Sequence, residues 1–127
     1  MALRRKGRPP VAIGHVFYQA ADVAAASRWF AAVGMRSIWC DDEVAVLELR
    51  GGTHLVVTKA ARKPRPGKAA PFDLMVDDVD AAQRNFAKQG LKPSRIRRGS
   101  IHDEFLLAGP DGMKVTVLSS HAGRRPV

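Results

Sequence analysis

The sequence has few cysteines, few aromatic side chains and no long apolar run, and each shortage excludes a class of protein. Cys40 is the single cysteine among 127 residues, so the chain has no internal disulfide and no second thiolate for a metal cage. No stretch approaches the roughly 20 consecutive apolar residues of a membrane helix. No run of secretory length follows the basic start either. We therefore expect a cytoplasmic protein with no membrane partner.

Acidic residues are also scarce, because 12 Asp and Glu face 21 Lys and Arg, which gives a net charge of +9. The basic residues gather in runs at 4–8, 62–68, 95–98 and 123–125. Such runs attract anions, from phosphate backbones to acidic metabolites. A nucleic-acid-associated protein that binds through its basic tails is thus one alternative. It is disfavoured because the chain has no Arg- or Asn-rich recognition helix, no aromatic stacking platform and no finger motif.

An internal repeat organises the chain. The stretch 71–90, PFDLMVDDVDAAQRNFAKQG, nearly repeats the stretch 15–34, HVFYQAADVAAASRWFAAVG. Each copy begins with a short alternating apolar run, which predicts a strand. Each then reaches an aspartate, Asp22 or Asp78, that can cap an alanine-rich helix, and a glycine follows where a left-handed C-cap would end that helix.

Three further segments, joined by tight turns, follow each predicted helix and indicate three more strands. They are residues 35–40, 44–50 and 53–60 in the first half and residues 91–100, 102–108 and 113–120 in the second. We therefore predict an α+β fold of two βαβββ modules, with Cys40 half-buried on a strand. One helix covers one face of such a sheet, so the open faces must close on each other or on a partner chain.

These elements give the boundaries of one compact domain, residues 11–120, with a tail at each end. The predicted parts are a basic N-terminal tail (1–10), the first module (11–60), a linker (61–70), the second module (71–120) and a C-terminal tail (121–127).

The repeat, with the motifs HVFYQAADVAAASRWFAAVGM, ELRGGTHLVV, VDDVDAA and GPDGMKVTVL, resembles the vicinal oxygen chelate superfamily. That superfamily includes glyoxalase I, extradiol dioxygenases, and fosfomycin and bleomycin resistance proteins. The resemblance covers residues 11–119 and implies that the modules form a curved mixed sheet around a central cavity. Because one fold hosts many chemistries, the reaction must be argued from the site.

The resemblance places His15, Val56, Pro71 and Thr116 where metal-dependent members of the superfamily hold their metal. A divalent transition metal needs at least three donors at about 2.0–2.3 Å, and His15 is the only usual ligand of the four. We therefore expect no metal or other cofactor here. A weakly bound divalent metal at a shifted site of His15, His54 and Asp73 is the alternative.

Alternation along the strands, counted from His15, predicts which side chains line the cavity. A small-molecule site combines an apolar lining with a few polar groups. The candidates are His15, Phe17, His54, Asp73, Met75, Lys114 and Thr116, together with Trp39 as a ring that would stack on the ligand. Asp73 and Lys114 are placed to form an ion pair across the cavity.

We interpret the chain as a glyoxalase-, bleomycin-resistance- or dioxygenase-like protein with a degraded metal site. It would bind a small anionic or polar aromatic molecule, because Lys114 and the basic rim favour negative or polarised ligands. The enzymatic alternative is a metal-dependent lyase or dioxygenase around His15 and His54. We also expect a homodimer, because the alternating sheets expose more apolar surface than two helices can cover.

Overall fold

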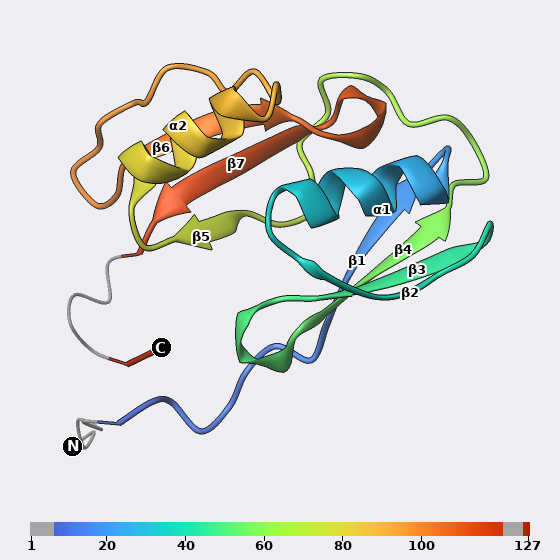
Figure 1. Cartoon of the computed structure of the whole chain (residues 1–127), viewed down its shortest axis with the longest axis horizontal. Helices are drawn as coiled ribbons and strands as arrows, with labels where there is room; N and C mark the ends of the chain where they lie inside the picture. The colour runs from blue at the N-terminus through green and yellow to red at the C-terminus, as the bar shows by residue number, and fades with distance from the viewer. Residues whose placement is uncertain (1–6, 121–125) are drawn as a thin grey trace.

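The computed structural model describes residues 7–120 and 126–127, which form two modules lying side by side (Figure 1). The first module consists of β1 (His15–Ala20), α1 (Val23–Ala32), β2 (Arg36–Cys40), β3 (Val44–Glu48) and β4 (His54–Lys59). Its strands form one sheet in the order β1-β4-β3-β2, with β1 parallel to β4. A short turn of 3-10 helix, η1 (Arg50–Gly52), joins β3 to β4. The βαβββ prediction is confirmed for this module.

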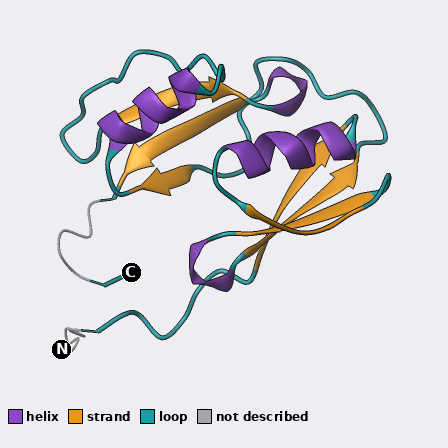
Figure 2. Ribbon diagram, viewed as in Figure 1, coloured by secondary structure: helices purple, strands orange, loops and turns teal. Residues whose placement is uncertain are grey.

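The second module has one strand fewer than predicted. It consists of β5 (Leu74–Val76), α2 (Val79–Lys88), β6 (Glu104–Ala108), a 3-10 turn η2 (Pro110–Gly112) and β7 (Lys114–Ser119). Its sheet has the order β5-β7-β6 (Figure 2). The strand expected at residues 91–100 is wrong, since this segment contributes only an isolated bridge between Arg97 and Glu104. Pro93 has no N–H to donate, and Lys92 has a positive φ of 52°, so the segment cannot continue a ladder.

Both helices begin where the sequence predicted. Asp22 accepts a hydrogen bond from the Ala25 N–H, and Asp78 accepts one from the Ala81 N–H, each at 3.0 Å. These bonds satisfy N–H groups that the first helical turn leaves free. Gly90 follows the end of α2 with a φ of +80°, the left-handed region that glycine adopts without strain. The α+β class is confirmed.

Each helix packs on one face of its own sheet and builds a separate core. The first core contains Tyr18, Phe30, Leu47, Leu55 and Val57, and the second contains Phe86, Phe105, Leu107, Val115 and Val117. Four partly buried side chains contact both cores: Trp29, Val33, Ala70 and Leu74. The two modules therefore share an apolar boundary.

A partly buried hydrogen bond crosses the same boundary. The Tyr18 hydroxyl donates to the Pro110 carbonyl at 2.7 Å, so β1 is tied to the turn between β6 and β7. Burial raises the pKa of the Tyr18 phenol well above its usual value, and the charge of Asp111 raises it further.

The remaining expectations concern the surface and the ends of the chain. Cys40 is exposed rather than half-buried, because β2 is an edge strand whose five residues all face solvent. Within the described residues, no helix has the length and apolar character needed to cross a membrane. The predicted basic tails lie largely outside the described part, which leaves out residues 1–6 and 121–125.

Candidate functional site

The face of the first sheet that α1 leaves open carries a row of polar side chains. The strand register aligns Arg36 of β2 with Glu48 of β3, Glu48 with His54 of β4, and His54 with His15 of β1. Residues directly opposed on neighbouring strands share one face of a sheet. Each of the four strands therefore contributes one polar residue to a single line across the open face.

Glu48 is the centre of this row. Its carboxylate accepts a hydrogen bond from Nε2 of His54 at 3.1 Å and forms an ion pair with Arg36. The His15 and His54 rings lie 5.9 Å apart between centroids. Because a carboxylate can only accept, Nε2 of His54 donates in this bond, and Nδ1 accepts a hydrogen bond when the ring is neutral. The row thus presents the imidazole of His54, held by Glu48, beside the ion pair of Glu48 with Arg36.

A second row, composed of apolar side chains, lies next to the polar one. The register aligns Trp39, Val46, Val56 and Phe17, again one from each strand. An irregularity between Ser37 and Trp39 shifts the β2 register and places the indole opposite Val46. Phe17 and Trp39 are 61% and 59% exposed, which is high for rings of this size. Successive rows are about 6.6 Å apart, close enough for one small molecule to contact both.

The structure brings together the four predicted site residues of the first module and separates them from those of the second. His15, Phe17, Trp39 and His54 all lie on the open face of β1-β4-β3-β2. Lys114 and Thr116 lie on the face of β7 opposite the buried Val115 and Val117, and Met75 is aligned with Leu118 of the same strand. The predicted pair of Asp73 with Lys114 is not among the ion pairs of the described residues.

Sequence reasoning missed Glu48 and Arg36. Their roles depend on the register of two hairpins, and a one-residue slip would move either side chain to the other face. The sequence signal that could have set the register was the glycine pair in the turn Arg50–Gly52. In the structure Gly51 and Gly52 have φ of 80° and 89°. A connection of that length brings Glu48 opposite His54.

The four residues at the positions matched to a metal site do not lie together in the described structure. Val56 lies in the apolar row, Pro71 precedes β5, and Thr116 lies in the other sheet from His15. Across residues 7–120 and 126–127, no cluster of three His, Cys, Asp or Glu side chains has the arrangement to hold a metal ion. Among the described residues, Asp73 therefore does not join His15 and His54 in such a cluster.

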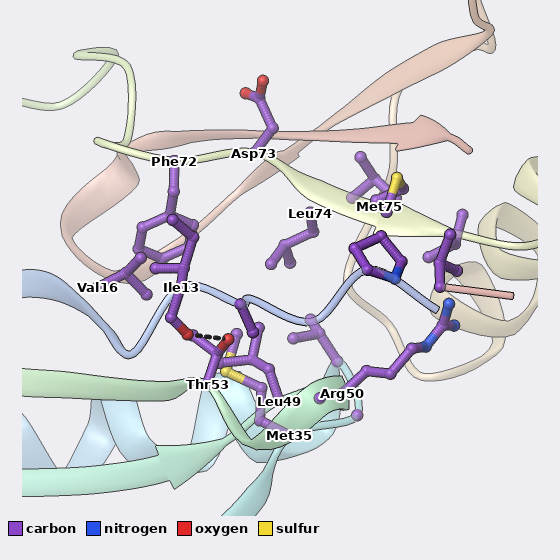
Figure 3. A pocket seen from close by; sticks show the side chains of 18 of the residues that line it. Ile13, Val16, Met35, Leu49, Arg50, Thr53, Phe72, Asp73, Leu74 and Met75 are labelled. Carbon is purple, nitrogen blue, oxygen red and sulfur yellow. Dashed lines mark hydrogen bonds between the residues drawn. The ribbon is translucent and has the colours of Figure 1, made fainter. Parts of the chain in front are cut away.

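A separate cleft of about 850 Å³ lies between the two modules. Figure 3 shows Phe72 and Leu74 of the second module reaching into the same space as Met35 and Leu49 of the first. Residues 8–13, which precede β1, also line it. Of the eight predicted ligand-binding residues, only Asp73 and Met75 line this cleft.

Two similar modules, each with a helix on one face of a sheet and the other face open, define a class of duplicated α+β proteins. No protein-family model matches the chain, and no curated protein matches it. A lactoylglutathione lyase from Agrobacterium tumefaciens is similar in structure, with a TM-score of 0.71 and 21% identity over 89% of this chain and 96% of that one.

Two further solved structures agree. A glyoxalase/bleomycin resistance protein/dioxygenase from Alicyclobacillus acidocaldarius has a TM-score of 0.69 at 19% identity, over 92% of this chain and 97% of that one. The oxidase ChaP-H2 has a TM-score of 0.66 at 15% identity, over 91% and 98%. The chain therefore has the fold of the vicinal oxygen chelate superfamily, as its sequence predicted.

Proposed function

We propose that the protein binds a small neutral aromatic molecule that carries a hydroxyl group, on the open face of β1-β4-β3-β2. The observation that supports this proposal is the pair of adjacent rows, one polar and one apolar, that cross all four strands. An aromatic body would lie along the apolar row between Phe17 and Trp39, which lie on the two edge strands, about 14 Å apart. Its hydroxyl would donate to the imidazole row.

The charge of the polar row favours a hydroxyl over an anion. The Glu48 carboxylate lies in the row between Arg36 and His54, so an anion bound there would meet a negative charge as well as the guanidinium. Nδ1 of His54 needs a donor, and a phenolic or enolic O–H supplies one. The rings of Phe17 and Trp39 favour an aromatic partner, since such pairs contribute about 0.5–1.5 kcal/mol beyond area burial.

We propose further that the protein functions as a homodimer in which the open faces are covered. Phe17 and Trp39 on the first sheet and Met75 and Leu106 on the second are exposed apolar side chains. A second copy would bury these groups and bring Met75, Lys114 and Thr116 of one chain to the rows of the other. This arrangement would unite the two groups of predicted site residues that one chain keeps apart.

The test is a thermal-shift screen with three matched sets of compounds: neutral phenols, aromatic carboxylates and aromatic cations. A ligand that binds the folded state raises the free energy of unfolding by about 2.7 kcal/mol at one hundred times its Kd. The melting temperature rises with it. We expect phenols to give the largest shifts. Phe17→Ala and His54→Ala should each weaken binding of the best phenol about tenfold.

Arg28→Ala is the matched control, because Arg28 is an exposed residue of α1, which covers the opposite face of the sheet. It should leave the affinity unchanged. Shifts confined to carboxylates or cations would show that the charge of the face is misread. Binding that survives both Phe17→Ala and His54→Ala would place the ligand elsewhere.

A further inference from the structure

The cleft between the modules has two apolar walls of different origin. Val16, Met35 and Leu49 line it from the first module, and Phe72, Leu74 and Val76 line it from the second. Its volume, about 850 Å³, is in the range of sites for small organic ligands, and such sites are mostly apolar with a few polar groups. None of Phe17, Glu48 or His54 lines it, so it is separate from the open face of the first sheet, and Met75 is the one residue that it shares with the proposed dimer face.

The charged groups around this cleft are unequal in sign. Arg8 and Arg50 line it, and Asp73 is its one acidic lining residue. Figure 3 shows the Asp73 carboxylate directed away from the apolar side chains that fill the view. A ligand in the cleft therefore meets the guanidinium groups of Arg8 and Arg50, and Arg8 is in none of the ion pairs of the described residues, which favours a negative charge on that ligand.

Arg50 is positioned to receive an anion. Its two terminal nitrogens each donate to one oxygen of Asp77 at 3.1 Å, and the side chain is half-exposed. A guanidinium has five N–H donors, so this pair leaves donors free. Asp77 does not itself line the cleft. Arg50 can thus bind a second carboxylate while Asp77 holds its orientation.

We propose that this cleft is a binding site for an organic anion with an aliphatic body, a medium-chain carboxylate in its simplest form. The chain of the ligand lies between the two apolar walls, and its carboxylate binds the Arg50 guanidinium at the rim. The flexible side chains of Met35 and Met75 adapt to a ligand of variable shape.

The experiment uses the full chain labelled with 13C at its methionine methyl groups. Met35 and Met75 line the cleft, whereas Met113 is buried in the first core and does not line it. Decanoate below its micellar concentration should shift the Met35 and Met75 resonances saturably and leave Met113 in place. Decanol should bind about tenfold more weakly, because it lacks the charge that Arg50 recognises. The resonance shifts caused by decyltrimethylammonium should not saturate.

Two exposed substitutions test the rim without touching either core. Arg50→Gln should weaken decanoate binding about tenfold, and Asp77→Asn, which releases the guanidinium, should strengthen it several-fold. Phe17→Ala should leave it unchanged, so failure of this site and failure of the open-face site are distinguishable. Equal affinity for decanoate and decanol would overturn the assigned charge. If the Met35, Met75 and Met113 resonances all shifted together, or if no shift saturated, the proposed site would be overturned.

Discussion

The hydroxyl of Tyr18 and the carbonyl of Pro110 lie 2.7 Å apart although 92 residues separate them in the chain. Tyr18 is a first-module strand residue with 1% of its surface exposed, and Pro110 begins the turn before β7. The Tyr18 ring also packs edge-on against the Phe30 ring, with 5.0 Å between the ring centroids. One side chain therefore belongs to the first core and holds the second module through its hydroxyl.

Tyr18→Phe should lower the free energy of unfolding by about 1–2 kcal/mol, because the Pro110 carbonyl loses its donor while the ring still fills the core. The folded state favours the neutral phenol, so this stabilisation is present below the ordinary tyrosine pKa near 10 and is lost as the pH rises above it. Urea unfolding of the wild type and the variant at neutral and alkaline pH checks both statements. A difference between the two proteins that grew with pH would contradict them.

Arg98 should hold the segment that replaces the missing strand. It donates to Asp80 of α2 at 2.7 Å and to Asp103 at 2.9 Å. Arg98→Ala should speed hydrogen–deuterium exchange across residues 95–103, whereas Arg95→Ala, a nearby exposed arginine, should not. Equal effects of the two substitutions would contradict this role.

The same ion pairs predict a pH dependence. The hydrogen bond from Arg98 holds the pKa of Asp80 below its ordinary value. A depressed carboxyl pKa stabilises the fold above the unfolded value, about 3.9, and that stability is lost as the pH falls through the folded value. The melting temperatures of the wild type and Asp80→Asn should therefore differ at pH 7 and converge under acid conditions.

Purified protein should carry less than about one-tenth of an equivalent of zinc, nickel, iron or manganese, because His15 has no second ligand at the matched positions Val56, Pro71 and Thr116. Elemental analysis after expression in metal-supplemented medium checks this. Stoichiometric metal that is lost in His15→Ala would contradict it and would favour the metal-dependent lyase or dioxygenase.

Sedimentation equilibrium should give a particle of twice the 13.8 kDa chain mass at micromolar concentration. Leu106→Asp, a charge on the open face of the second sheet, should dissociate it. Val11→Asp is the control, since Val11 is exposed and lies before β1 on neither sheet. A monomeric wild type would exclude the proposed pairing.

Local chemistry was readable from the sequence, whereas register was not. The aspartate caps and the glycines after the helices depend on a few neighbouring residues, and the structure has them as predicted. The strand expected at 91–100 failed because the pattern of the first half was carried over to a segment that contains Pro93 and several charged residues. The same limit concealed the polar row, since Arg36, Glu48 and His54 are aligned by two turns acting together.

The alternation of side chains along the strands correctly predicted which residues share a face within each module. It did not predict how the two modules lie relative to each other. Counting from His15 correctly put Phe17 and His54 on one face, because alternation is fixed by the strand backbone. It could not state how two sheets face each other. That depends on shared apolar side chains and on contacts such as Tyr18 with Pro110.

Trp29, Val33, Ala70 and Leu74, which contact both cores, bear on how the duplicated chain unfolds. Two independent copies would melt as separate cooperative units, with a half-folded intermediate between the transitions. Here the loss of either core strips apolar partners from the other and leaves those four side chains in water. We therefore expect the duplicated chain to unfold as a single cooperative unit, because neither copy expressed alone retains the boundary that completes its interior.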